Sequence, residues 1–159
     1  IKNVLIFFEK ASKLGCPKAD FYIGYCNIND YGIDHLKKAA DAGDPDAQNR
    51  YAYYLEKGIL MKENKEEAKK YYKLAADQEH PEAMFEYGKN LYENSSKEKL
   101  KNEGINYLKK SADKMFPDAI YMYSKICRDT NPEDSRRLFE LSLEKGSQLA
   151  LKDQELNQK

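Results

Sequence analysis

Apolar residues recur at steps of three and four positions in two stretches between Asp44 and Gln78. This spacing places them on one side of a helix, so each stretch predicts an amphipathic helix. The first carries Ala47, Tyr51, Ala52 and Leu55, and the second carries Ala68, Tyr71, Tyr72, Ala75 and Ala76. Pro45 suits the first turn of a helix, where its missing N–H has no helical partner, and Asp44 suits the N-cap before it. Gly58 ends the first helix, so residues 45–78 predict a helical hairpin.

The same pattern recurs along the chain. Pro-x-Ala starts a predicted helix at Pro17, Pro45, Pro81 and Pro117, at spacings of 28, 36 and 36 residues. A small residue follows each proline by seven positions, namely Gly24, Ala52, Gly88 and Ser124. Because glycine costs about 1 kcal/mol relative to alanine inside a helix, these residues predict a close crossing of the two helices of each hairpin. Self-similarity at this period predicts a solenoid in which each hairpin stacks on its neighbours.

The repeat predicts one elongated array rather than two domains. Its predicted parts are a half-repeat helix at 1–14, repeats at 17–42, 45–78, 81–114 and 117–145, and a terminal half-repeat or cap at 148–159. In the first repeat, a turn is expected over residues 27–32 and a short helix from about Ile33. In the last part, Gln148 occupies the proline position.

The order Pro-x-Ala, small residue, glycine turn and Ala-x-x-Tyr-Tyr-x-Leu-Ala-Ala resembles the Sel-one-like repeats, which are relatives of the tetratricopeptide repeats. The match is closest at 45–78 and 81–114, is partial at 17–42 and 117–145, and covers nearly the whole chain. The resemblance implies an all-α fold, a right-handed α–α superhelix built from helical hairpins. It also implies an adaptor for protein complexes.

Composition favours a folded protein without a general nucleic-acid or membrane surface. Of the 159 residues, 41% are hydrophobic and 34% are charged, which suits a folded chain. The 27 basic residues balance 27 acidic ones, whereas nucleic-acid binding needs a local basic excess. No apolar run approaches the roughly 20 residues of a membrane span. The chain begins at Ile1 inside a predicted second helix, so we expect an excised piece or a processed product.

A search for catalytic chemistry gives no motif that predicts an enzyme. The chain has no glycine-rich phosphate loop, no HExxH and no CxxC, so no cofactor and no metal are expected. The two histidines, His35 and His80, fall in different repeats, and we expect packing and turn roles for them. The three cysteines, Cys16, Cys26 and Cys127, do not supply a pair in each repeat. They predict reduced thiols, which favours a cytoplasmic location although the sequence does not determine it.

The predicted binding surface lies on the first helices, which line the concave face of stacked hairpins. Its residues are Phe21, Tyr25, Asn49, Tyr53, Phe85, Lys89, Tyr92, Tyr121 and Lys125. Aromatic residues at equivalent places in successive repeats would suit an extended or helical peptide, and the lysines could meet its carboxylates. The alternative is that these rings pack between helices as core. The carboxylate clamp of some tetratricopeptide proteins uses repeated Lys and Asn here, and only Asn49, Lys89 and Lys125 are present.

These observations predict a non-catalytic scaffold that binds a protein or peptide on its concave face. One alternative is a helical-repeat binder of single-stranded RNA, since repeats of this size also read single strands. A second is an enzyme of the hydrolase or cell-wall-binding kind. A third is a regulatory repeat segment of a larger enzyme such as a kinase.

Overall fold

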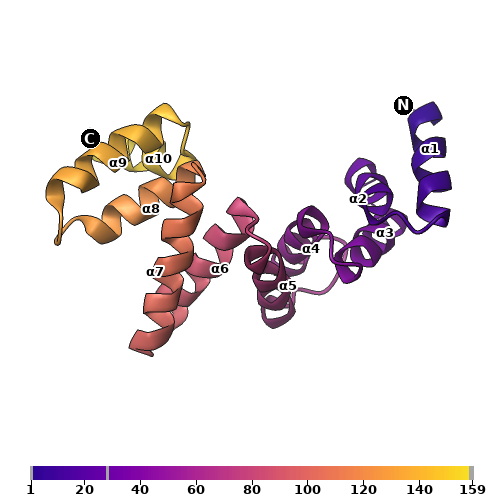
Figure 1. The fold of residues 1–159 in the computed structure, drawn as a ribbon, viewed down its shortest axis with the longest axis horizontal. Helices are drawn as coiled ribbons and strands as arrows, with labels where there is room; N and C mark the ends of the chain where they lie inside the picture. Colours follow the sequence, from indigo (N-terminus) through magenta and orange to yellow (C-terminus); the bar gives the residue numbers. More distant parts are fainter. Residues whose placement is uncertain (1, 28, 158–159) are drawn as a thin grey trace. The chain divides into compact units, whose positions relative to one another are not determined.

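A computed structural model describes residues 2–27 and 29–157, and every regular element within them is an α-helix. The helices are α1 (Lys2–Lys13), α2 (Pro17–Cys26), α3 (Asp30–Asp41), α4 (Pro45–Lys57), α5 (Lys65–Asp77), α6 (Pro81–Asn94), α7 (Glu98–Asp113), α8 (Pro117–Cys127), α9 (Pro132–Glu144) and α10 (Gln148–Asn157). Consecutive helices pair as hairpins, α2 with α3, α4 with α5, α6 with α7 and α8 with α9 (Figure 1). The predicted all-α class is confirmed.

The chain divides into two units, which we call unit 1 (residues 1–80) and unit 2 (residues 81–159). In unit 1, α1 packs on α2, and α3 packs on α4 of the next hairpin. In unit 2, α7 packs on α8, and α10 packs on α8 and α9. Each unit therefore contains two hairpins joined through the second helix of one and the first helix of the next.

Prolines begin the first helix of each hairpin, as the sequence predicts. Helices α2, α4, α6 and α8 start at Pro17, Pro45, Pro81 and Pro117. The Asp44 side chain caps α4 by accepting a hydrogen bond from the Ala47 backbone N–H at 2.9 Å. Gly58 ends the same helix in the left-handed conformation, with a φ of 65°. Both predicted end signals of α4 are confirmed.

Helix α3 starts at Asp30, earlier than the predicted start near Ile33. The Asn29 side chain caps it by accepting a hydrogen bond from the Gly32 backbone N–H at 2.9 Å. Asparagine is among the best N-caps. Part of the segment predicted as a turn, from Asp30 onward, therefore belongs to the first turn of α3. The predicted turn over 27–32 is too long, and its residue 28 lies outside the described residues.

Small residues lie where the two helices of a hairpin cross, as the sequence predicts. A Cβ atom on Gly88 of α6 would lie 2.8 Å from the Gly104 carbonyl oxygen of α7, and one on Gly104 would lie 2.6 Å from the Gly88 oxygen. In the first hairpin, a Cβ on Gly24 would lie 2.7 Å from the Gly32 carbonyl oxygen. Side chains cannot be accommodated at these distances without moving the backbone. The sequence prediction named only the first-helix residue of each pair.

The residue three positions after each proline is buried, and in unit 1 it is hydrogen-bonded to the helix before its own. It is polar in unit 1, where it is Asp20 and then Gln48, and apolar in unit 2, where it is Met84 and then Ile120. The Gln48 amide donates to the Ala40 carbonyl oxygen at 3.1 Å and accepts from the Gln78 amide at 2.9 Å. Buried polar groups need such partners.

Asp20 is the centre of a hydrogen-bonded cluster of four residues. Ser12 of α1 donates to Asp20 Oδ1 at 2.6 Å, and Lys38 Nζ of α3 lies 3.0 Å from Asp20 Oδ2. His35 Nδ1 lies 2.6 Å from Asp20 Oδ1, and the His35 ring packs edge-on against Tyr31 at 4.6 Å. His35 therefore has the predicted packing role and also contributes to the cluster that joins α1, α2 and α3.

Unit 2 has a contiguous apolar core. Its buried residues are Phe85, Leu108, Ala112, Ala119, Ile120 and Met122. Partly buried apolar side chains, among them Tyr92, Ile126 and Leu149, pack around this core. The core thus reaches the face formed by the first helices of unit 2, where the candidate site lies.

Candidate functional site

The first helices of unit 2 form a pocket of about 500 Å³, which we call the groove pocket. Its lining residues are Lys89, Tyr92 and Glu93 of α6, Tyr121, Met122, Lys125 and Ile126 of α8, and Leu149 of α10. Four residues of the predicted binding surface therefore meet at one pocket: Lys89, Tyr92, Tyr121 and Lys125. The volume lies within the roughly 300–1,000 Å³ that ligand pockets occupy.

The repeat register explains why these side chains meet. Lys89 and Lys125 each stand eight residues after the proline that begins their helix. Each therefore projects from the same turn of two neighbouring first helices. Each ammonium also lies one helical turn beyond an aromatic ring, with Lys89 Nζ 5.7 Å from the Phe85 ring centroid and Lys125 Nζ 5.3 Å from that of Tyr121. Such i, i+4 pairs are neighbours on a helix surface, and the contact is of the cation–π kind.

The Tyr121 hydroxyl is the polar centre of the groove pocket. Lys125 Nζ donates a hydrogen bond to it at 3.1 Å. Burial raises the pKa of Tyr121, and a hydrogen bond with Asp153 of α10 adds to the rise, while Lys125 opposes it. The hydroxyl is therefore neutral at physiological pH and acts as a hydrogen-bonding group. Met122, Ile126 and Leu149 supply the apolar wall beside it.

Three residues of the predicted binding surface are buried. Phe85 is 3% exposed and Tyr121 is 7% exposed in unit 2, and Asn49 is 7% exposed in unit 1. Phe85 packs against Phe116, with ring centroids 5.4 Å apart. Phe85 is therefore a core residue, which was the alternative to a binding role, because its side chain does not reach the surface.

The predicted residues of unit 1 include two exposed tyrosines. Tyr25 of α2 is 53% exposed and Tyr53 of α4 is 40% exposed. Arg50 of α4 reaches over the Tyr25 ring at 5.2 Å, and Lys57 lies over the Tyr53 ring at 5.9 Å. Phe21 is half-buried beside Tyr25. The first helices of unit 1 therefore present cations on aromatic rings, as those of unit 2 do.

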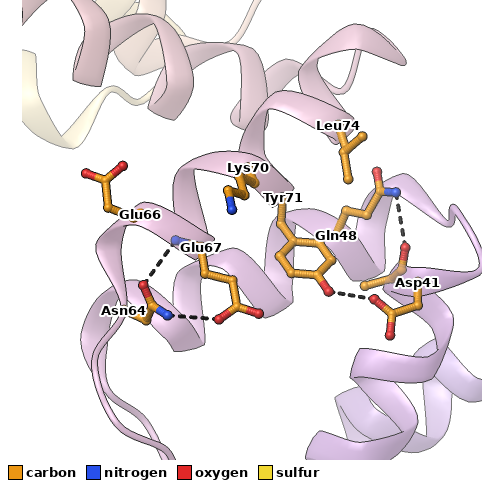
Figure 2. Close-up of a pocket in the computed structure, with 9 residues that line it drawn as sticks. Asp41, Gln48, Asn64, Glu66, Glu67, Lys70, Tyr71 and Leu74 are labelled. Atoms are coloured by element: carbon orange, nitrogen blue, oxygen red, sulfur yellow. Dashed lines mark hydrogen bonds between the residues drawn. The ribbon is translucent and has the colours of Figure 1, made fainter.

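A second pocket, of about 580 Å³, lies in unit 1 between α3, α4 and α5, and no sequence argument had pointed to it (Figure 2). Tyr71 of α5 extends toward Asp41 of α3, and its hydroxyl donates to Asp41 Oδ1 at 2.5 Å. Burial and this hydrogen bond hold the pKa of Tyr71 well above its usual value. At the start of α5, the N-cap residue Asn64 donates to the Glu67 carboxylate at 2.9 Å.

Unit 2 has a pocket of about 430 Å³ at the equivalent repeat positions. It is lined by Asp113, Asn131, Asp134, Arg137 and Leu138, where unit 1 has Asp41, Asn64, Glu67, Lys70 and Tyr71. Asn131 donates to Asp134 as Asn64 does to Glu67. The signal that could have found these pockets is the shared repeat position of Asp41 and Asp113, each directly after the small-residue pair of a second helix.

Across residues 2–27 and 29–157, His, Cys, Asp and Glu side chains do not gather in a group of three that could hold a metal ion. Cys16 and Cys26 are exposed free thiols, and Cys127 is a half-buried one. None of the helices described there has the length and apolar character needed to span a membrane.

Comparison with known proteins identifies the repeat. A model of the Sel1 repeat matches residues 27–44, 45–80 and 81–114, which together make up more than half of the chain. The predicted resemblance to Sel-one-like repeats is confirmed. A comparison with curated proteins gives no match.

Two solved structures share the fold. A Sel1 repeat protein from Oxalobacter formigenes is similar with a TM-score of 0.81 and 22% identity, over 96% of this chain and 67% of that one. The protein c5321, a protective antigen present in uropathogenic Escherichia coli strains and displaying an SLR fold, has a TM-score of 0.81 and 19% identity over 92% of this chain. This chain spans 34% of that protein. At identities this low the similarity shows the fold alone. The structural similarity confirms the predicted solenoid of helical hairpins.

Proposed function

We propose, from the finding that this chain belongs to the Sel1 repeat family, that it is a non-catalytic scaffold that binds a segment of another protein. The family has a helical-repeat fold commonly used for protein–protein interaction. The proposed binding surface is the first-helix face, with the groove pocket as its centre in unit 2. Tyr25 and Tyr53 would make the corresponding contacts in unit 1.

The observation that carries this proposal is the groove pocket itself. Three successive first helices, α6, α8 and α10, contribute to it. Its wall combines apolar side chains with two lysines and two tyrosines. Tyrosine is favoured at interfaces because its ring offers a large apolar area and its hydroxyl a hydrogen bond. Central, partly desolvated pockets of this kind hold the anchor residues that dominate protein–protein binding energy.

The groove pocket favours binding over catalysis. The Tyr121 hydroxyl is kept neutral by burial, so it does not have the pKa near 7 that suits a general base. Lys125 already donates a hydrogen bond to this hydroxyl. We therefore assign the polar groups of the pocket to recognition.

Site-directed photocrosslinking tests the proposal. A photoreactive phenylalanine derivative would replace Tyr92, which lines the groove pocket. The matched control places the same group at Asn106, an exposed position on α7 of the same unit. In an extract of the native cell, we expect position 92 to form a crosslink that mass spectrometry maps to one segment of a partner protein, and position 106 not to form it.

Identical crosslinks from both positions, or crosslinks from position 106 alone, would contradict the proposal. Either result would place binding outside the groove pocket. Circular dichroism of both labelled proteins checks that each retains its helicity.

A further inference from the structure

We propose that the groove pocket recognises a partner segment in which one large apolar side chain stands next to acidic residues. This inference rests on the proposed function and specifies the chemistry of the partner. It follows from what the pocket offers at its wall and at its rim.

The wall of the groove pocket calls for an apolar anchor. Met122 is 9% exposed and belongs to the apolar core of unit 2. Ile126 and Leu149 pack against the same core and line the pocket. A bulky apolar side chain placed here would extend an existing hydrophobic core, at about 25 cal/mol for each Å² of apolar surface removed from water. A polar or small side chain would not gain this energy.

The rim of the groove pocket, formed by Lys89 and Lys125, favours a negatively charged partner. Lys89 and Lys125 stand on neighbouring helices, and the lining contains a single carboxylate, that of Glu93. Lys89 Nζ lies over the Phe85 ring and Lys125 Nζ donates to the Tyr121 hydroxyl, so both contact neutral groups. An ammonium has three donors, and each lysine therefore retains donors for a carboxylate of the partner. Asp153 is the further acidic group near Tyr121.

The combination favours a protein segment over RNA. Phosphates would also meet the lysines, and bases would stack on the tyrosines. The affinity for RNA, however, increases with the number of protein lysines and arginines that contact phosphates along the strand. The groove pocket has two lysines against one carboxylate, which suits one or two acidic side chains beside an anchor.

Short fluorescent synthetic peptides test this chemistry by anisotropy on the full chain. The peptides combine a central Trp or Ala with flanking Glu or flanking Lys residues. We expect the Trp peptide with Glu flanks to bind, and both Trp→Ala and Glu→Lys changes to weaken it at least about tenfold, as loss of an anchor contact does. Equal binding of the Glu-flanked and Lys-flanked Trp peptides would overturn the proposal.

Charge reversal of the rim makes the test specific. The double variant Lys89→Glu, Lys125→Glu should lose the Glu-flanked peptide and prefer the Lys-flanked one. The matched control reverses Lys97 and Lys99, two exposed lysines at the start of α7, and should bind as the unmodified chain does. Circular dichroism checks that each variant is helical. If the control variant lost binding equally, the assignment to this rim would be wrong.

The two proposals can fail separately. If a partner segment crosslinks at position 92 but contains no acidic residue beside its apolar anchor, the present inference is wrong and the proposed function stands. If the groove pocket captures a single-stranded RNA in competition with the Glu-flanked peptide, both are wrong. Peptide preference that switches with Lys89 and Lys125 supports both.

Discussion

Asp20 is a carboxylate that unit 1 buries and ties to three neighbours. It is 2% exposed, and burial alone would raise its pKa. Hydrogen bonds from Ser12, His35 and Lys38 outweigh that effect and hold the pKa below its usual value. The folded chain thus stabilises the charged form, and three helices are joined through it.

Replacing Asp20 by asparagine should destabilise the chain by about 2 kcal/mol at pH 7, because charge-assisted hydrogen bonds are lost. Since the folded pKa lies below the unfolded value of about 3.9, the unfolded state takes up the proton first as the pH falls. The contribution of ionised Asp20 to the free energy of unfolding is therefore present above pH 4, and it is lost as the pH falls through the pKa of the folded state. Urea unfolding of both proteins at pH 7 and about pH 3 measures this difference, which should shrink at the lower pH.

Asp46 provides the matched control on the next first helix. Its side chain is 43% exposed and pairs with Lys18. Exposed ion pairs contribute about 1 kcal/mol or less, so Asp46→Asn should have the smaller effect at pH 7. A difference between wild type and Asp20→Asn that stayed the same at both pH values would show that the Asp20 charge is not the source of stability.

Helices α6 and α7 cross at Gly88 and Gly104, where their backbones are too close for a Cβ atom. Gly88→Ala should therefore destabilise the chain by about 1–3 kcal/mol, the range for overpacking. Helix propensity alone would give the opposite sign, a gain of about 1 kcal/mol. Asn106→Ala, at an exposed position on α7, is the control and should be neutral or slightly stabilising. Thermal unfolding that shows Gly88→Ala more stable than wild type would contradict the close crossing.

Helix ends were predictable where the signal is local. Pro45, Asp44 and Gly58 act on adjacent backbone groups, so their positions alone identify the ends of α4. The start of α3 was missed because Asn29 serves both as a turn residue and as an N-cap. Local signals could not choose between these two roles.

The candidate site was harder to predict, because exposure depends on neighbouring helices. Asn49, Phe85 and Tyr121 stand four residues after their prolines and are buried, whereas Tyr25 and Tyr53 stand eight residues after theirs and are exposed. The sequence prediction treated both positions alike. A single turn of helix separates them, and the packing of adjacent helices decides which turn is covered. Leu149 was missed because its repeat lacks the proline.

The whole chain balances 27 basic residues with 27 acidic ones. Cations nevertheless gather on aromatic rings of the first helices in both units, as Lys57 does over Tyr53 and Lys125 over Tyr121. Such pairs could stack on bases as well as contact a peptide. The net charge of the whole molecule favours the peptide over RNA, because RNA binding requires many basic residues that neutralise phosphates.

We therefore expect the chain to bind a random single-stranded RNA no more tightly than about 10⁻⁴ M at about 150 mM salt, the weak end of non-specific binding. Fluorescence anisotropy over a series of salt concentrations measures both the affinity and its salt dependence. A protein without a basic excess should show little binding and a shallow slope, whereas a steep slope would mean that many phosphates contact lysine and arginine. Tight, steeply salt-dependent binding would favour the helical-repeat RNA binder. Weak RNA binding beside peptide binding that responds to Lys89 and Lys125 would favour the protein-binding scaffold.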